Sequence, residues 1–360
     1  MPNPRARTNT PAAHLLYDEA TSLSTTTRRG NTWLLFLLTI ALLTGCGNGN
    51  APDDSSNPST PQTESQNEAP PRGTIGFSAL TLKNPFFKII ADSLTAEAEE
   101  HGFNVIINDA ERDVNTQAKH IDNYIAQQVT AIVINPADRE AIGPAVKQAN
   151  QAGIPVFTCD LQCTAPDVEI AGHVGTDNYQ GGLLAGEAML EAVGSESGGK
   201  LLILHFAQAN SCVLRVDGFR KVIDAHNAEN SDARFEMIEL EGGGLQDEGF
   251  RATSDALQAH PDLSGIFAIN DPSALGAWTA LNQAGREDDV VIVGFDGQLE
   301  GKQAIRDGKI YADPIQFPEQ MGQMTVRNIV AYLDGEDFEQ VHLIPTELYT
   351  QTDAQQDPDL

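Results

Sequence analysis

From Thr74 onward, short runs of apolar residues alternate with longer stretches in which apolar positions recur at helical spacing. The apolar runs predict strands over residues 74–80, 104–108, 131–135, 155–159 and 170–175. The stretches between them predict helices over residues 86–101, 114–127 and 140–151. The third run reads Ala-Ile-Val-Ile, and an uninterrupted apolar run is typical of a parallel strand that is covered on both faces.

The second half of the chain repeats this rhythm. Strands are predicted over residues 200–206, 234–240, 265–269, 290–294 and 310–315. Helices are predicted over residues 177–193, 213–226, 247–260, 272–283, 299–306 and 319–333. The fold class is therefore α/β, with two similar doubly wound parallel-sheet lobes. Ligands of such sheets bind beyond the carboxyl ends of the strands, so the residues that directly follow each strand are the candidates for function.

The N-terminal region has a different pattern. Residues 33–43 are almost all apolar and follow Arg28 and Arg29, but eleven residues are fewer than the roughly 20 that a membrane span needs. They fit the apolar core of an export signal. The segment ends in Leu-Thr-Gly-Cys46, which resembles the lipobox of bacterial lipoproteins. We expect residues 1–45 to be a removed signal peptide and Cys46 to be lipidated; the alternative is an ordinary signal peptide that contains a cysteine.

Residues 46–72 are then the lipidated cysteine and a disordered tether, because this run is polar and rich in Asn, Ser, Pro, Gln and Glu. Charge adds a further restriction. The chain has 22 Lys and Arg against 51 Asp and Glu, a net charge of −29, and loss of residues 1–45 would change it to −31. Such a surface repels phosphate, which argues against nucleic acid as a partner.

Polar and aromatic side chains gather where the predicted strands end. They are Asn84, Phe86, Phe87, Asp160, Asn270, Asp296 and Gln316. Carboxylates accept hydrogen bonds from hydroxyls, amides donate and accept, and aromatic faces pack on sugar rings, so this set suits a sugar. Each residue alone could instead cap the helix that follows it, and we expect this capping role for Asp177 and Asp271. Because two adjacent residues at a helix start point in different directions, only one of Phe86 and Phe87 is expected to face the cleft.

The chain from residue 73 to about 350 resembles the ribose-binding-protein family, the type I periplasmic sugar-binding proteins of ABC transporters. The matching pieces include Asn84-Pro85-Phe86-Phe87, Ile134-Asn135-Pro136, Thr176-Asp177-Asn178, Asp217-Gly218-Phe219, Asn270-Asp271 and Gly294-Phe295-Asp296-Gly297. The resemblance implies an N-terminal lobe of residues 73–176 plus 317–345 and a C-terminal lobe of residues 177–316 plus 346–352. Three crossovers form the hinge, and residues 353–360 are expected to be a flexible tail.

The resemblance also carries the family's sugar contacts onto the seven residues that follow the strands. Three contacts depart from the family. Leu161 and Val213 stand where the ribose binders have arginines, and Gly242–Gly244 aligns with an aromatic residue. Arg215 matches a nearby family arginine that supports the cleft from the side. We expect a roomier, more acidic and more apolar pocket, with Leu161 and Val213 lining it, that binds a neutral monosaccharide or polyol other than ribose.

The remaining cysteines and the motif search bear on catalysis. Cys159, Cys163 and Cys212 leave three alternatives open: a bond between Cys163 and Cys212 that ties the lobes together, a bond between Cys159 and Cys163, or unpaired thiols. The sequence holds no H-E-x-x-H, G-x-x-x-x-G-K-[ST] or G-x-S-x-G motif. We therefore expect no enzyme activity, no cofactor and no metal.

The resemblance implies a mechanism and partners. Sugar binding closes the hinge, and the closed form docks on an ABC permease whose partner ATPase drives uptake. The protein is expected to be a monomer, lipid-anchored to a bacterial membrane on its extracytoplasmic side. The alternative function is that of a sensor which presents a sugar or signal molecule to a chemoreceptor or sensor kinase.

Overall fold

The computed structural model describes residues 71–196 and 198–360. The predicted signal peptide, Cys46 and nearly all of the predicted tether lie outside these residues. In the described part of the chain, no helix combines the length and the apolar character that a membrane crossing requires. The described residues form a single compact unit that contains two sheets, and each sheet with its helices is called a lobe below.

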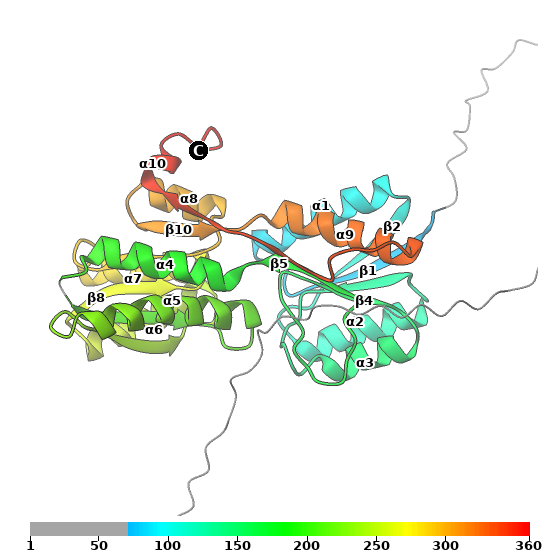
Figure 1. Cartoon of the computed structure of the whole chain (residues 1–360), viewed down its shortest axis with the longest axis horizontal. Coiled ribbons are helices and arrows are strands. Elements are labelled where there is room, and N and C mark those ends of the chain that lie inside the picture. Colours follow the sequence, from blue (N-terminus) through cyan, green and yellow to red (C-terminus); the bar gives the residue numbers. More distant parts are fainter. Residues whose placement is uncertain (1–70, 197) are drawn as a thin grey trace, which may run out of the picture. The chain divides into compact units, whose positions relative to one another are not determined.

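The first lobe is built on a six-stranded sheet in the order β11-β5-β4-β3-β1-β2, in which all pairings are parallel. Its strands are β1 (Gly73–Ala79), β2 (Phe103–Asp109), β3 (Ala131–Ile134), β4 (Val156–Cys159), β5 (Gly172–Thr176) and β11 (Val341–Ile344). Its helices are α1 (Pro85–Glu100), α2 (Val114–Ala126), α3 (Gly143–Gln151) and α9 (Pro318–Asp334). Helices α1 and α9 pack together, as do α2 and α3, so the sheet is covered on both faces (Figure 1).

The second lobe repeats this design with the order β12-β10-β9-β8-β6-β7. Its strands are β6 (Gly199–His205), β7 (Phe235–Glu241), β8 (Leu263–Ala268), β9 (Val291–Val293), β10 (Ala312–Ile315) and β12 (Glu347–Thr350). Its helices are α4 (Asn178–Val193), α5 (Asn210–Glu229), α6 (Gln246–Ala259), α7 (Asp271–Ala284), α8 (Leu299–Arg306) and α10 (Gln351–Ala354). Helices α4 and α5 pack together, as do α6 and α7. The predicted fold of two doubly wound lobes is confirmed.

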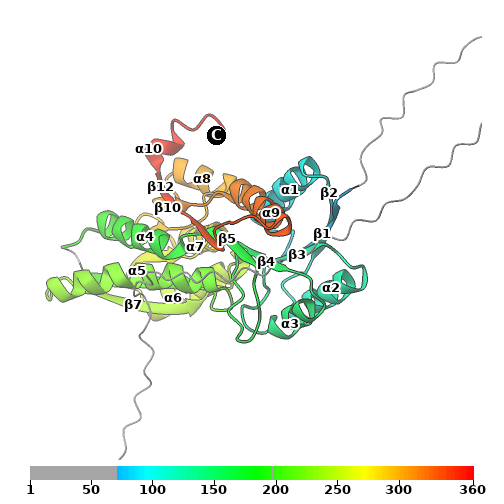
Figure 2. The ribbon, with the colours of Figure 1, turned by 45° about the vertical axis from the view of Figure 1, so that its right-hand side comes forward.

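The chain passes between the lobes three times. It leaves the first sheet after β5, returns from β10 to α9, and crosses again between β11 and β12. Strand β12 lies antiparallel beside β10 at the edge of the second sheet (Figure 2). The sequence pattern did not predict β11 and β12, because each has only four residues and β11 is mostly exposed, so neither forms a continuous apolar run.

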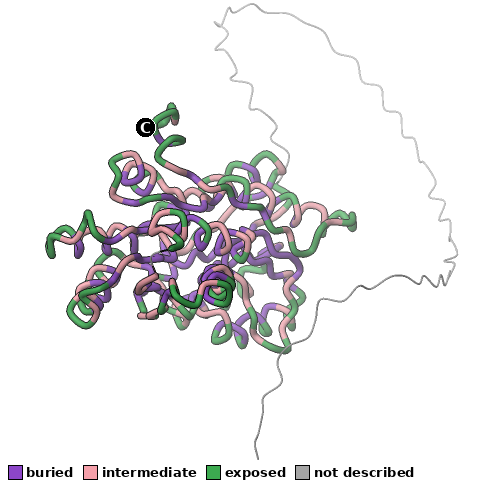
Figure 3. Tube along the Cα trace, turned by 60° about the vertical axis from the view of Figure 1, so that its left-hand side comes forward, coloured by how far each residue is buried: buried purple, intermediate pink, exposed green. Residues whose placement is uncertain are grey.

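Buried residues run through both sheets and the helices beside them (Figure 3). One buried apolar cluster continues from the α1 and α9 face of the first lobe into the α4 and α5 face of the second. Helices α4 and α5 approach so closely that a Cβ on Gly182 would lie 2.2 Å from the carbonyl oxygen of Arg215. This contact fixes the start of α5, which brings its side chains to the inner end of the second sheet. The C-terminal tail, residues 353–360, packs against the second lobe: Lys302 of α8 pairs with Asp357, and Arg306 of α8 donates to the Leu360 carbonyl.

Candidate functional site

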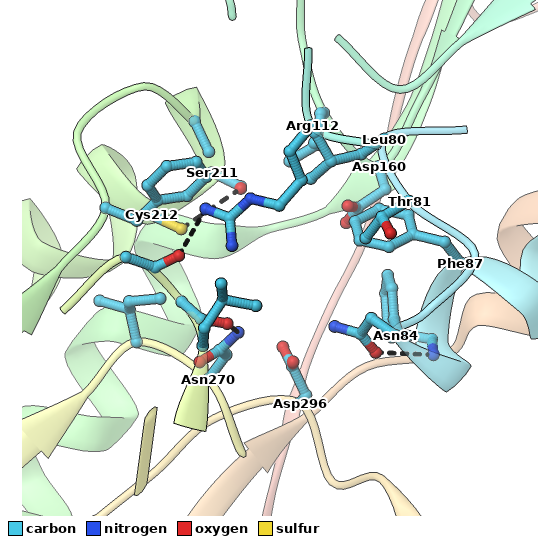
Figure 4. A pocket seen from close by; sticks show the side chains of 18 of the residues that line it. Leu80, Thr81, Asn84, Phe87, Arg112, Asp160, Ser211, Cys212, Asn270 and Asp296 are labelled. Carbon is cyan, nitrogen blue, oxygen red and sulfur yellow. Dashed lines mark hydrogen bonds between the residues drawn. The ribbon is translucent and has the colours of Figure 1, made fainter. Parts of the chain in front are cut away.

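A pocket with about 540 Å³ of empty space lies at the carboxyl ends of the strands of both lobes. In Figure 4, Thr81, Asn84, Phe87 and Asp160 lie on one side of the pocket, and Ser211, Cys212 and Asn270 lie on the other. Asp296 lies between the two groups. The polar groups of two lobes therefore converge on one cavity, as the topology of two parallel sheets predicts.

Nearly all the predicted ligand-binding residues line this pocket. They are Asn84, Phe86, Phe87, Asp160, Leu161, Asn270, Asp296 and Gln316. Val213 is not among the lining residues, so its predicted position in the pocket is wrong. Ser211, Cys212 and Arg215 of α5 line the pocket instead, and successive helical residues point about 100° apart, so Val213 points to the side of this face.

The first-lobe wall is formed by the start of α1. The Asn84 Oδ1 caps this helix by accepting a hydrogen bond of 2.9 Å from the Phe86 backbone N–H, which leaves its amide group for the pocket. Phe86 and Phe87 pack edge to face with ring centroids 5.5 Å apart. Both rings line the pocket and both are buried, whereas only one was expected to face the cleft. The pair therefore offers a preformed apolar surface.

Asp160 follows β4 in a left-handed backbone conformation with φ 59°, which aspartate tolerates better than most residues. Its side chain is buried, and its Oδ1 atom has no hydrogen-bond partner among the described residues. Burial raises the pKa of the Asp160 carboxyl to about 7, although the charge of Arg215 opposes this rise. An unpartnered buried carboxyl that lines a pocket is suited to a ligand that donates hydrogen bonds.

This raised pKa makes stability depend on pH. Below pH 7 the folded protein holds a proton on Asp160 that the unfolded chain releases near pH 4, so unfolding free energy falls as pH rises through this window. One proton contributes up to about 1.4 kcal/mol per pH unit to the slope of unfolding free energy against pH. We expect the slope for Asp160→Asn to be shallower than that of the wild type by up to this amount. Urea unfolding of the ligand-free protein from pH 4 to 8 measures it. Asp271 and Asp313 also have raised pKa values and remain in both proteins, so part of the decline should persist in the variant. Parallel curves of unfolding free energy against pH for the two proteins would contradict the expectation.

Asp296 lies in a buried hydrogen-bond network on the second-lobe side of the pocket. Its Oδ1 atom accepts hydrogen bonds from Arg215 Nη1 at 2.9 Å and from Gln316 Nε2 at 2.5 Å. The Gln316 Oε1 in turn accepts from the Thr176 hydroxyl at 2.7 Å, which joins two of the three crossovers. Arg215 also donates to Asn178 and stacks on the Phe295 ring at 3.8 Å. The Asp296 carboxylate is thus largely satisfied by the protein itself, unlike Asp160.

Asn270, rather than Asp271, caps the start of α7. The Asn270 Oδ1 accepts from the Ser273 N–H at 3.1 Å and from the Ser273 hydroxyl at 2.7 Å, while its Nδ2 donates to the Gly244 carbonyl. The expected capping role of Asp271 is therefore wrong. Asp271 is buried one position inside the helix and accepts from the Gln298 N–H. Asp177 does cap its helix as expected, accepting from the Gln180 N–H at 3.0 Å.

The sequence analysis missed Arg112, which enters the pocket from the turn after β2. Its Nη2 donates to the Gly243 carbonyl at 2.5 Å, and its guanidinium lies 4.7 Å from the centroid of the Phe206 ring. Phe206, which follows β6, is a second-lobe aromatic that the sequence analysis also missed. The expectation of a more acidic pocket is wrong, because Arg112 and Arg215 line the pocket together with Asp160 and Asp296. Phe206 was predicted as the last residue of the strand over residues 200–206, whereas β6 ends at His205, and Arg112 stands four residues beyond the predicted strand over residues 104–108.

The cysteines of the described part of the chain are unpaired. Cys159 and Cys212 are buried, Cys163 is partly buried, and all three are free. Burial raises the pKa of the Cys212 thiol to about 11, so at neutral pH this pocket-lining group is a small neutral side chain. Among the described residues there is no cluster of three or more His, Cys, Asp or Glu side chains that could hold a metal ion.

Known proteins resemble this chain over most of its described part. A family model described as a periplasmic binding protein domain matches residues 75–337. The ribose import binding protein RbsB of Escherichia coli (strain K12) is 35% identical over 269 residues, which are 74% of this chain and 86% of that protein. The D-apiose import binding protein of Paraburkholderia graminis is 35% identical over 234 residues, which are 65% of this chain and 72% of that protein.

A solved structure shows the same architecture. The ABC transporter solute-binding protein from Bacillus halodurans C-125 with bound myo-inositol matches with a TM-score of 0.72 at 27% identity. The match covers 80% of this chain and 98% of that one.

Proposed function

Because this chain belongs to the periplasmic binding protein family, we propose that it captures a sugar and delivers it to an ABC permease. Its relatives in the family include binding proteins for the import of ribose and D-apiose. Similar solute-binding proteins of solved structure hold myo-inositol or D-fucose. The relatives are transport proteins rather than enzymes or sensors, so the sensor alternative gains no support. The protein acts outside the cytoplasm, as periplasmic binding proteins do.

One observation carries the proposal most directly. The pocket between the lobes offers the buried Asp160 carboxyl, whose Oδ1 has no partner among residues 71–196 and 198–360, beside the paired rings of Phe86 and Phe87. A sugar fits both groups: its hydroxyls donate hydrogen bonds to the carboxyl, and the C–H side of its ring packs on the aromatic faces. The Asn84 amide and the second-lobe residues complete the polar lining.

The mechanism follows from the three crossovers. With the lobes apart, a sugar enters and contacts the first-lobe residues Asn84 and Asp160; closure then brings Asn270 and Asp296 to its other side. The ligand binds the closed form better because only this form offers both sets of contacts, so binding shifts the population toward it. The closed form then docks on the permease, and its partner ATPase drives uptake.

The finer features of the proposal concern the ligand and the anchor. The ligand is a neutral monosaccharide or polyol, since the pocket sets Arg112 and Arg215 against Asp160 and Asp296 and has no surplus of carboxylates. The protein is a monomer that is held to the membrane through lipidated Cys46. It needs no cofactor and catalyses no reaction.

A thermal-shift panel tests the proposal. The chain from residue 73 is mixed with D-ribose, D-allose, D-apiose, D-fucose, myo-inositol and glycerol, with sucrose as a control for general solute effects. We expect at least one sugar other than D-ribose to raise the melting temperature in a saturable manner, because only the folded state binds it. Stabilisation by D-ribose alone would overturn the predicted departure from ribose. A flat response to the whole panel would contradict sugar capture.

A further inference from the structure

Arg112 spans the pocket from one lobe to the other. It belongs to the first lobe, in the turn between β2 and α2, but its guanidinium contacts Gly243 and Phe206 of the second lobe. The Nη2 atom donates to the Gly243 carbonyl, and the guanidinium lies over the Phe206 ring. Among the described residues, its Nε and Nη1 groups have no hydrogen-bond acceptor, although the residue lines the pocket.

The backbone on both sides is shaped for this contact. Glu111 and Arg112 have φ values of 51° and 62°, a left-handed conformation that is costly for two consecutive residues other than glycine. The turn is held by the Arg112 N–H, which donates to the Leu80 carbonyl at 2.8 Å, and by the Glu111 N–H, which donates to Asp109. Strain of this kind persists where the surroundings enforce it, and here it directs a cation into a pocket.

The facing loop has its own left-handed pair, Gly243 and Gly244, with φ values of 60° and 66°. Glycine suits both positions, because it adopts a left-handed backbone at little cost. This conformation turns the Gly243 carbonyl toward the first lobe, where Arg112 reaches it. The loop aligned with an aromatic residue of the family in the sequence comparison, and it serves here as an acceptor for a cation.

Arg112 also closes the pocket on one side. A second, more open pocket is lined by Arg112, Phe206, Gly243 and Leu245, which it shares with the sugar pocket, and by Arg251 and other residues that the sugar pocket lacks. The four shared residues therefore form the partition between the two spaces. Replacement of the guanidinium by a shorter side chain would remove part of this wall as well as a set of donors.

We propose that Arg112 is a specificity-determining residue of the sugar pocket, which clasps the second lobe at Gly243 and Phe206 and donates its remaining N–H groups to oxygens of the bound sugar. The inference rests on the proposed function for the sugar, but its interlobe contact is independent of which sugar binds. A guanidinium is a planar set of donors with no acceptor, so it selects ligands that place accepting oxygens at that end of the pocket.

Titration calorimetry with D-ribose, D-allose, D-apiose and myo-inositol tests the inference on Arg112→Gln and Arg112→Lys. The control is Arg251→Gln, which removes the same charge from a side chain that is 65% exposed and lines only the second pocket. We expect Arg112→Gln to weaken binding at least tenfold and to change the ratios of affinities between sugars. Arg112→Lys should retain part of the affinity, and the control should stay within twofold of the wild type.

Two results would overturn the inference. Unchanged affinities in Arg112→Gln would remove the residue from the site, and a uniform loss with unchanged ratios would reduce it to a link between lobes. If none of the four sugars binds the wild type, the proposed function fails for this panel, and hydrogen exchange then decides the inference separately. Without sugar, Arg112→Gln should speed exchange of the amides of residues 243–245 relative to the control, and equal rates would refute the contact.

Discussion

Asp160→Asn is expected to reduce the affinity for sugar between about tenfold and a hundredfold, the range that corresponds to loss of a hydrogen bond to a charged group. The carboxyl is buried and its Oδ1 has no partner in the described part of the chain, so a sugar hydroxyl is the donor that satisfies it. Asparagine keeps the shape and tolerates the left-handed backbone of this position. Calorimetry with the best sugar of the panel measures the change.

The same substitution should leave the fold intact. Replacement of a buried ionisable group without a partner removes a desolvation cost, so the unfolding free energy at pH 8 is expected to stay the same or to rise. Asp138→Asn provides a matched control, since Asp138 lies outside the pocket and caps its own turn through the backbone N–H groups of Glu140 and Ala141. If Asp160→Asn binds sugar as tightly as the wild type, the assigned role is refuted. A lower unfolding free energy of this variant at pH 8 would also refute it.

Arg215→Met is expected to cost about 3–5 kcal/mol of unfolding free energy, the typical loss when one partner of a buried ion pair is removed. Both side chains are almost fully buried, with 5% and 6% of the Arg215 and Asp296 side chains exposed. Without the guanidinium, the Asp296 carboxylate would lose its counter-ion, and the Ile269 carbonyl and the Asn178 amide oxygen would lose a donor. Urea unfolding at pH 7 measures the loss.

A double variant separates charge from packing. Combining Arg215→Met with Asp296→Asn removes the unpaired charge, so this protein should lose less stability than Arg215→Met alone. The control Arg251→Met changes an exposed arginine and should stay within about 0.5 kcal/mol of the wild type. If the double variant loses as much as the sum of the two single variants, the two residues do not stabilise each other.

The sequence predicted the sheets well because their strands are buried on both faces. Strands such as β3 and β9 consist of consecutive apolar residues, so the pattern alone locates them. Strand β11 is mostly exposed, and it is held by its parallel pairing with β5 rather than by an apolar run. A pairing between segments this far apart leaves no local signal, so β11 and β12 could not be predicted from periodicity.

The site was predicted where a residue's place follows from a strand end, as for Asn84, Asp160 and Asp296. Residues were missed or misplaced where the reach of a long side chain, or the face of a helix, determines which residue lines the pocket. Arg112 reaches the pocket because two left-handed residues turn it across the cleft, and the sequence of that turn contains no glycine to signal it. Val213 was misplaced because alignment gives a position in a helix but not which neighbour faces the cavity.

The edge strand β11 has a consequence for how the chain assembles. The first sheet gains its last strand only when Val341–Ile344 pairs with His173–Thr176, and the second sheet gains its edge strand from Glu347–Thr350 directly afterwards. Neither lobe can be completed while the final segment is missing, so a chain that is still being synthesised remains an unfinished fold until almost its last residues emerge. Pairings between distant segments form slowly because a long loop must close first. A nearly complete chain would therefore lack one edge strand in each sheet until these residues emerge.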